Sequence, residues 1–195
     1  MPAEATMRAL RHVWLALKPL DIPMAVMGGL ALAAWKYVRA TKDVDLLLGI
    51  AGDEPGPLLE TLQAAGIRPR QLPIIRLGQL ELIRTFYEPP EAFVDIEIDL
   101  LLAKSDYHRQ ALARRVPMQL AGLDVEIAVL SCEDLILHKL LAERMIDRVD
   151  IGALLQANRN SLDLSYLLQC ARKLGHSPVL AEAWASVWPG ESLPE

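Results

Sequence analysis

The stretch VMGGLALAAWKYVRATKDVDLLLG, residues 26–49, limits the possible folds of this chain more than any other part of it. An apolar run ends at two glycines, a segment with helical spacing follows, and the chain then enters D-V-D-L-L-L. Residues two apart in a strand share a face, so Asp43 and Asp45 point to one side while Val44 and Leu46 point to the other. The pattern predicts a strand, a tight turn, a helix and a second strand that carries two carboxylates on one face.

A second acidic strand is predicted over residues 92–102, AFVDIEIDLLL, where apolar and polar residues alternate. Asp95, Glu97 and Asp99 share one face of it. If the two strands are neighbours, their carboxylates converge, and two charges about 5 Å apart repel by roughly 3 kcal/mol at an effective dielectric near 20. A divalent cation would offset this repulsion, because Mg²⁺ prefers carboxylate oxygens together with substrate phosphates, and two ions can clamp a phosphoryl displacement. A solvent-exposed edge without a ligand is the alternative for Asp95 and Glu97.

Gly28 and Gly29 stand between the first strand and the helix. Free backbone N–H groups and the helix dipole favour an anion at such a place, and the missing side chains let a phosphate approach closely. Together with the carboxylates, the glycines predict one site with N–H donors for phosphates and acids for the metal ions that bridge them. A Gly-Gly pair by itself is an ordinary turn, so the prediction depends on the combination.

The remaining segments complete an α+β pattern. Helical spacing predicts a helix over 7–17, and alternation predicts a strand over 79–88 and a hairpin over 116–130. Ser131 with Asp134 has the pattern of a helix N-terminal cap. Further helices are predicted over 30–38, 58–66, 106–115, 151–156, 164–174 and 178–188.

Length and charge narrow the class of protein. The 195 residues are enough for one core with a helical appendage, and we expect domains at 1–130 and 131–195, the second packed on the first. A net charge of −5 disfavours broad wrapping of nucleic acid, which needs a basic surface. No signal peptide and no apolar stretch long enough for a membrane span are recognisable. These features predict a cytoplasmic protein without a membrane partner or extensive DNA binding.

The order of Gly-Gly, helix, D-x-D strand and later acidic strand resembles the nucleotidyltransferase fold of the DNA polymerase β superfamily. The segment GGLALAAWKYVRATKDVDLLL is more similar to the abortive-infection (AbiEii-type) toxin nucleotidyltransferases and their bacterial relatives, in which an Arg-x-Thr-x-Asp-x-Asp run follows the glycines. That run begins here with Arg39 and Thr41. The later segment LSCEDLILHKLLAERMIDRVDIGALL resembles the same group's second motif, in which a helix carries a lysine, here Lys139, before an Arg/Asp-rich turn.

The resemblance implies an α+β nucleotidyltransferase fold, a mixed β-sheet flanked by helices, with a helical C-terminal region. It implies transfer of a nucleoside monophosphate from an NTP to a hydroxyl of an RNA, such as tRNA, or of a protein, with release of pyrophosphate. Two Mg²⁺ ions are expected beside the NTP substrate. The protein would be the toxin of a toxin–antitoxin or phage-defence pair, with an antitoxin as its partner.

The resemblance also assigns roles to individual residues. Asp43, Asp45 and Asp99 would be catalytic and metal-binding, and Asp99 would complete the metal site and help to take the proton from the attacking hydroxyl. Gly28 and Gly29 would cradle the β- and γ-phosphates. Further nucleotide or phosphate contacts are assigned to Arg39, Thr41 and Lys139.

Alternatives stay open for several of these roles. Asp95, and then Glu97, compete with Asp99 for the place of the third acid. Lys139 is equally well explained as a surface lysine on an amphipathic helix. The turn lacks the serine that many active transferases have at the position of Gly29, so one hydroxyl contact to phosphate is missing.

Two further pairs of alternatives concern charge and function. Asp147 and Asp150 fit structural ion pairs with Arg144 or Arg148 better than metal binding. A catalytically degenerate protein of the same fold, which binds a nucleotide or a partner, is one rival function. A small-molecule nucleotidyltransferase of the antibiotic-modifying kind is the other, because its acceptor pocket would also be acidic.

Overall fold

The chain forms two compact units. The computed structural model describes residues 2–50, 55–69, 74–77, 80–90 and 92–193. The first unit comprises Met1–Ala31 with Arg39–Leu130, and the second comprises Leu32–Val38 with Ser131–Glu195. The predicted domains at 1–130 and 131–195, and the packing of one on the other, stay predictions.

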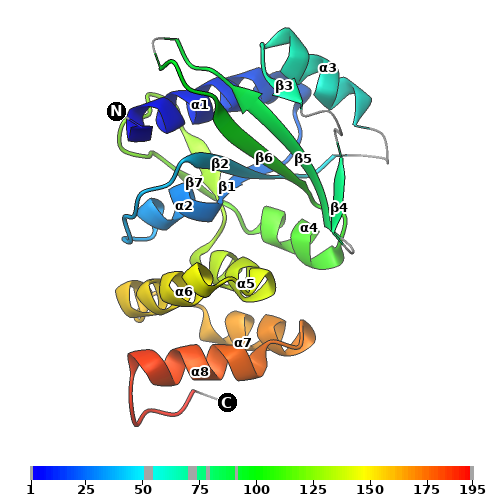
Figure 1. Cartoon of the computed structure of the whole chain (residues 1–195). Helices are drawn as coiled ribbons and strands as arrows, with labels where there is room; N and C mark the ends of the chain where they lie inside the picture. Colours follow the sequence, from blue (N-terminus) through cyan, green and yellow to red (C-terminus); the bar gives the residue numbers. More distant parts are fainter. Residues whose placement is uncertain (1, 51–54, 70–73, 78–79, 91, 194–195) are drawn as a thin grey trace. The chain divides into compact units, whose positions relative to one another are not determined.

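Among the residues that the structure describes, the first unit contains a mixed sheet of eight strands (Figure 1). The strands are β1 (Met24–Met27), β2 (Asp43–Leu48), β3 (Arg68–Pro69), β4 (Ile75–Leu77), β5 (Leu80–Tyr87), β6 (Ile96–Leu102), β7 (Val116–Met118) and β8 (Ile127–Val129). Their order is β3–β5–β6–β2–β1–β8–β7, and β4 also pairs with β5. β2 runs parallel to β6 and β1 parallel to β8, while the other pairs are antiparallel. The predicted α+β class with a mixed sheet is confirmed.

Helices cover both faces of this sheet. They are α1 (Pro2–Leu17), the 3-10 turn η1 (Lys18–Leu20), α3 (Gly56–Ala64) and α4 (Asp106–Ala113), and α2 (Gly28–Ala34) begins in the same unit. α1 and α3 lie on one side of the sheet and α4 on the other (Figure 1). α1 contacts β2 and β6, and α4 contacts β2. The central strands are therefore covered on both faces.

The alternation along β2 decides where its acids lie. Val44 and Leu46 are fully buried on one face. On the other face, Leu47 belongs to a buried cluster that includes residues of α4. Asp43 and Asp45 share the face of Leu47 but precede it, and both are only partly buried. The apolar half of the strand thus fixes the backbone that carries the two carboxylates.

β6 is shorter than the sequence predicts. It begins at Ile96 rather than at residue 92, so Asp95 precedes the strand and does not share its alternation. The ladder with β5 ends at the pair of Tyr87 and Ile96. Two prolines follow soon after β5, and proline lacks the N–H group that would continue a ladder.

The helix after β1 also differs from the prediction. It begins at Gly28 itself and ends at Ala34 instead of covering 30–38. Only seven peptide dipoles therefore sum along its axis, and the contribution of its macrodipole to an anion site is small. Gln79, predicted as the first residue of the strand that became β5, lies outside the described residues.

The second unit is helical, as predicted for this part of the sequence. It contains α5 (Cys132–Ala142), α6 (Met145–Asn158), α7 (Leu164–Lys173) and α8 (Ser177–Val187). Ser131 caps α5, because its hydroxyl accepts a hydrogen bond from the backbone N–H of Asp134 at 3.1 Å. Leu154, Leu167 and Leu180 are fully buried in this unit. Among the described residues, no helix combines the length and apolarity needed to cross a membrane.

Candidate active site

A row of side chains crosses three neighbouring strands of the first unit. Asp99 on β6 pairs in register with Asp45 on β2, and Asp45 pairs with Met27 on β1. Laterally paired residues point to the same face, so Asp45 and Asp99 stand side by side. Asp43 lies one row away, where it pairs with Glu97. The two acidic strands are therefore neighbours, and the sheet gathers their carboxylates into one acidic patch.

Gly28 follows Met27 and lies against the carboxylate of Asp45. A Cβ atom on Gly28 would overlap Oδ2 of Asp45, and the φ angle of Gly28 is +61°, which other residues adopt only with strain. Gly29 is equally confined, because its Cβ would lie 2.5 Å from Oγ1 of Thr41. Both glycines are required for this close approach, and a group bound at the carboxylates would also lie near their backbone.

Thr41 connects the two glycines with the D-x-D pair. Its hydroxyl donates a hydrogen bond to Oδ1 of Asp43 at 2.5 Å, and the same oxygen fills the space that a side chain on Gly29 would need. A serine at position 29 is therefore incompatible with Thr41 in this place, which gives a physical reason for Gly-Gly in this chain. Arg39 precedes this segment, and its Nη1 donates to the carbonyl of Ala40 at 3.1 Å.

Arg84 on β5 extends the row by one strand, and the sequence analysis missed it. It pairs in register with Asp99, and its Nε and Nη2 donate to the two carboxylate oxygens of Asp99 at 2.9 and 2.7 Å. Nη2 also lies 3.1 Å from Oε1 of Glu97. The hydrogen bonding with Asp99 raises the pKa of Arg84 most, and the charges of Asp99, Glu97 and Asp45 raise it further against the opposing effect of burial. The guanidinium is thus a permanent cation inside the acidic patch.

The acidic patch fits a metal ion that arrives with its nucleotide better than one held by protein alone. In the part of the chain that the structure describes, no three His, Cys, Asp or Glu side chains gather closely enough to hold a metal. Asp43 is engaged by Thr41 and Asp99 by Arg84. One or two carboxylates completed by substrate phosphates are nevertheless an ordinary Mg²⁺ environment. Asp43 and Asp45 offer that donor chemistry.

Asp95 and Glu97, which compete with Asp99 for the place of the third acid, lie elsewhere relative to Asp45. Asp95 precedes β6, and its Oδ1 accepts a hydrogen bond from Nη2 of Arg68 at 2.5 Å on an exposed part of the surface. Glu97 is on β6 but pairs in register with Asp43 rather than with Asp45. Of the three candidates, Asp99 has the position beside Asp45.

Lys139 belongs to the second unit, where it lies in a buried ion cluster. Its Nζ is 2.6 Å from Oδ2 of Asp150 and 3.1 Å from Oδ1 of Asp147. The lysine side chain is 4% exposed, and those of Asp147 and Asp150 are 1% and 0% exposed. The interpretation of Lys139 as a surface lysine is therefore wrong.

Arg144 joins the same cluster from its exposed side. Its Nε donates to Oδ2 of Asp147 at 2.7 Å, so the predicted structural pair of these residues is present. Arg148 contacts Glu182 at 3.7 Å instead of an aspartate. Burial raises the pKa of Asp147, but the hydrogen bond from Arg144 and the charge and hydrogen bond of Lys139 outweigh it, and the pKa lies below its ordinary value.

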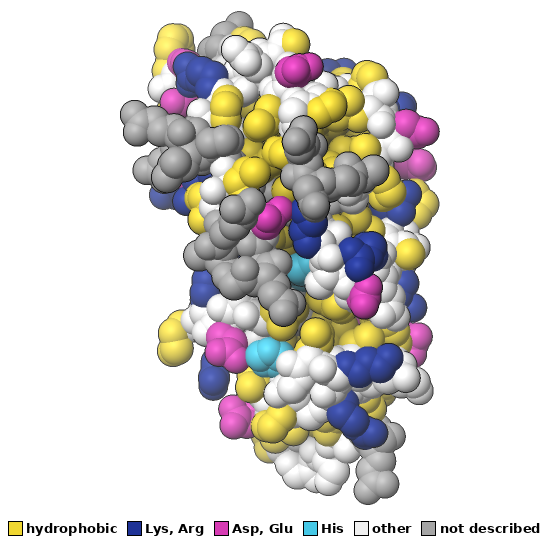
Figure 2. Space-filling view, turned by 90° about the vertical axis from the view of Figure 1, so that its right-hand side faces the viewer, with side chains coloured by type: hydrophobic (Ala, Val, Ile, Leu, Met, Phe, Trp, Pro, Cys, Tyr) yellow, Lys and Arg dark blue, Asp and Glu magenta, His cyan; other side chains and the backbone are white. Residues whose placement is uncertain are grey.

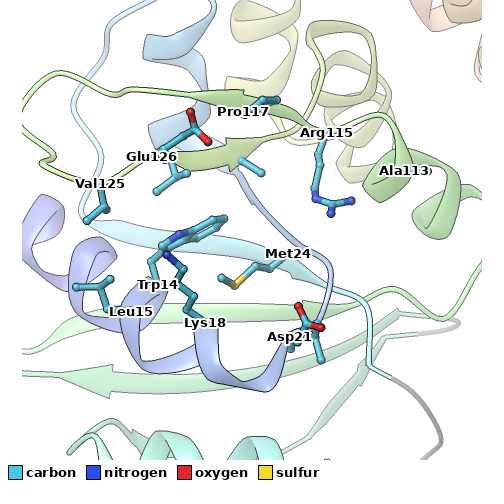
Figure 3. Close-up of a pocket in the computed structure, with 13 residues that line it drawn as sticks. Trp14, Leu15, Lys18, Asp21, Met24, Ala113, Arg115, Pro117, Val125 and Glu126 are labelled. Carbon is cyan, nitrogen blue, oxygen red and sulfur yellow. The ribbon is translucent and has the colours of Figure 1, made fainter.

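A cavity of about 710 Å³ in the first unit contains none of the predicted site residues (Figure 3). Trp14 of α1 and Lys18 of η1 enter it, beside Met24 of β1 (Figure 3). Its wall is completed by Leu15, Asp21, Ile22, Ala113, Arg115, Pro117, Val125, Glu126, Ile127 and Ala128. The acidic patch is therefore a separate feature of the molecule.

Solved structures of several nucleotidyltransferase-like proteins share this fold. An antigenic nucleotidyltransferase-like protein from Paracoccidioides brasiliensis is 20% identical, with a TM-score of 0.55 over 94% of this chain and 96% of that one. The antibiotic-resistance factor ANT(2″)-Ia is 16% identical, with a TM-score of 0.54 over 95% and 98%. A protein from H. pylori described as a putative nucleotidyltransferase is 17% identical, with a TM-score of 0.54 over 97% and 84%. No curated protein sequence matches the chain significantly.

A family match covers nearly the whole sequence. The sequence model of the family described as "Nucleotidyl transferase AbiEii toxin, Type IV TA system" matches residues 8–191. This span includes the acidic patch of the first unit and the ion cluster of the second. The chain therefore belongs to the AbiEii family of nucleotidyltransferase toxins.

Proposed function

We propose that this protein is a Mg²⁺-dependent transferase that moves a nucleoside monophosphate from an NTP to a hydroxyl of an RNA or a protein. The observation that carries the proposal is the placement of Asp45 beside Asp99 and against the backbone of Gly28. Carboxylates for a metal and the backbone at the start of α2 occur together there. A lone D-x-D pair or a lone glycine turn would not support this reaction.

In the proposed reaction, the acceptor oxygen attacks the α-phosphorus of the NTP. The new O–P bond forms while the bond between the α-phosphorus and the bridging oxygen breaks, and pyrophosphate leaves with that oxygen. Asp99 takes the proton of the acceptor hydroxyl. Asp43 and Asp45 would hold Mg²⁺ against the triphosphate at the rigid N-terminal end of β2. Mg²⁺, when bound, would neutralise the charge that develops on the phosphate oxygens.

The phosphate contacts come from residues around the glycines. Gly28 and Gly29 admit the β- and γ-phosphates close to the backbone, and Arg39 adds positive charge. Thr41 places its hydroxyl oxygen where a side chain on Gly29 would be, and its proton, which Asp43 accepts in this structure, becomes available to a phosphate when Asp43 turns to the metal. The phosphate role of Lys139 stays a prediction from the sequence, because its ammonium is engaged by Asp147 and Asp150 within the second unit.

The acceptor is expected to make a narrow contact. The net charge is −5, and on the face shown in Figure 2 basic and acidic side chains are interspersed rather than gathered into a broad basic area. A terminal hydroxyl of an RNA such as tRNA, or a protein hydroxyl, needs no long basic groove. In line with the type IV description of its family, we propose that the protein is a cytoplasmic toxin paired with an antitoxin.

Calorimetry with NTPs tests the proposal. The native protein is expected to bind an NTP only when Mg²⁺ is present, and Asp43→Ala/Asp45→Ala is expected to abolish this binding. Asp21→Ala/Asp124→Ala is the matched control, because it removes two exposed aspartates outside the acidic patch. Absence of NTP binding to folded native protein would overturn the proposal in favour of a degenerate binding protein.

Transfer of label from α-³²P-NTP then identifies the acceptor. Incubation with total RNA, with cell protein and with an aminoglycoside separates the three acceptor classes. Label on RNA or protein that depends on Asp45 supports the proposal. Label on the aminoglycoside alone would favour the small-molecule transferase instead.

A further inference from the structure

The acidic patch contains more negative charge than its own cation can neutralise. Asp43, Asp45, Glu97 and Asp99 lie on one face of β2 and β6, and Arg84 contacts the last two directly. Asp99 occupies the middle of the row, between Arg84 on one side and Asp45 on the other. The carboxylate that the proposed reaction needs at the metal is thus the one that the arginine holds with two hydrogen bonds.

We propose that Arg84 is a counter-cation that occupies Asp99 until a divalent cation binds, and then moves one of its hydrogen bonds to Glu97. The inference rests on the proposed function, because it concerns the carboxylate that completes the metal site. It makes Arg84 a positioning residue that acts through Asp99. It also makes Glu97 the carboxylate that accepts the hydrogen bond of Nη2 when this atom leaves Asp99.

The required movement is small. Nη2 of Arg84 lies between Oδ2 of Asp99, at 2.7 Å, and Oε1 of Glu97, at 3.1 Å. A small shift of Nη2 toward Glu97 frees Oδ2 of Asp99, while Nε can keep its hydrogen bond to Oδ1. The three side chains are 28%, 14% and 34% exposed for Arg84, Asp99 and Glu97, so water can assist the exchange.

The exchange explains why Asp99 would bind the metal ion only when nucleotide is bound as well. A divalent cation carries twice the charge of the guanidinium, but without phosphates it finds Asp43 held by Thr41 and Asp99 held by Arg84. The triphosphate adds oxygen ligands and lets the cation compete for Asp99. Arg84 would thus reduce the net negative charge of the acidic patch in the resting protein and limit binding of free cations.

Mn²⁺ titration in the absence of nucleotide tests this role. Arg84→Gln is expected to bind Mn²⁺ about tenfold more tightly than the native protein, because one competing positive charge is gone. Arg84→Lys keeps the charge but not the two-pronged geometry, and its affinity should fall between the two. Glu97→Gln should weaken Mn²⁺ binding, since the guanidinium is left with a neutral and weaker acceptor in place of a carboxylate. Calorimetry and the electron paramagnetic resonance of free Mn²⁺ measure the affinities.

Arg11→Gln is the matched control. Arg11 makes the same two-pronged contact, with Asp124 at 2.6 and 2.9 Å, but on an exposed surface outside the acidic patch. Its Mn²⁺ affinity should equal that of the native protein. In EDTA, Arg84→Gln should unfold at a lower temperature than Arg11→Gln, and Mn²⁺ should restore the difference, because the carboxylates repel one another without a counter-cation.

The outcomes separate this inference from the proposed function. Equal or weaker Mn²⁺ binding by Arg84→Gln, in a protein that still binds NTP with Mg²⁺, overturns only the role of Arg84. Tighter Mn²⁺ binding without any NTP binding overturns only the transferase. If no variant binds Mn²⁺ without nucleotide, the role of Arg84 is overturned, and the transferase is decided separately by NTP binding in the presence of Mg²⁺.

Discussion

The two units each contain a cluster in which basic side chains meet aspartates, and the clusters differ in burial and balance. In the second unit, Lys139 faces Asp147 and Asp150 with all three side chains at most 4% exposed. In the first unit, Arg84 faces Asp99 and Glu97 with exposures between 14% and 34%. The first unit places additional carboxylates in the neighbouring positions on β2, whereas Arg144 adds a second cation to the cluster of the second unit.

The ion cluster of the second unit is fixed, whereas the acidic patch of the first unit can exchange its ionic partners. A charge buried without its partner is costly, so a balanced and dehydrated cluster holds its members in one arrangement. An incompletely neutralised cluster that reaches water can exchange one partner for another at a lower cost. The second cluster is therefore suited to orient a lysine, and the first to accept a cation.

Of the variants that test the difference between the two clusters, Lys139→Met should have the largest effect on stability. Lys139→Met leaves two carboxylates in a buried site with only Arg144 beside one of them, so the free energy of unfolding should fall by about 3–5 kcal/mol. Urea denaturation measures the change. Arg159→Gln, which removes an exposed pair with Glu191, should cost no more than about 1 kcal/mol. Similar losses for the two variants would contradict the distinction between the clusters.

The Gly29→Ser substitution should distort the acidic patch without changing its charge. Its Cβ would lie 2.7 Å from the Cβ of Thr41, so Gly29→Ser should lower the free energy of unfolding by about 1–3 kcal/mol. NTP binding should weaken as well, because Thr41 must move away from Asp43. Adding Thr41→Gly removes the obstruction, and a double-mutant cycle should show recovery of stability. Purely additive losses would refute the steric explanation.

Acid should weaken the buried cluster in a defined pH range. The pKa of Asp147 is lower in the folded protein than its ordinary value near 3.9, so its contribution to stability is complete above that value and is lost as the pH falls through the folded pKa. The difference in unfolding temperature between the native protein and Asp147→Asn should therefore shrink below about pH 4. A difference that stays constant down to pH 3 would show that the pKa of this carboxyl is the same in the folded and the unfolded protein.

The smallest change is expected when the buried charges are removed together. Lys139→Met/Asp150→Leu replaces a dehydrated pair by apolar side chains, which in other proteins is often nearly neutral for stability. Asp147 keeps Arg144 as its partner. The double variant should therefore unfold within about 1 kcal/mol of the native protein. A loss of stability as large as that of Lys139→Met would mean that the pair itself stabilises the fold.

The alternation along β2 predicted the strand and the shared face of Asp43 and Asp45, because a half-buried strand has a period of two. The pairing of Asp45 with Asp99 required a further assumption, that two strands more than 40 residues apart are neighbours. Arg84 was missed because alternation assigns a residue to a face but does not specify which residue of the next strand it meets. That register depends on where the β5–β6 connection ends the ladder.

Lys139 shows a second limit of sequence patterns. All residues of α5 from Cys132 to Leu140 are buried, so the helix has no solvent-exposed face in this part, and the amphipathic interpretation was wrong. The partners of the lysine come from α6, eight and eleven positions later. Those two aspartates were recognised as structural, but a pattern within one helix could not show that they close on a lysine of another.

The row from Arg84 to Gly28 is assembled from four strands whose residues are widely separated along the chain. During synthesis on the ribosome, no part of the site can exist in finished form until β6 has emerged and paired on both of its sides. A slip of β5 by one residue would turn Arg84 to the opposite face of the sheet. A nascent or misregistered chain would therefore lack the proposed site, and we expect its activity to arise only after folding is complete.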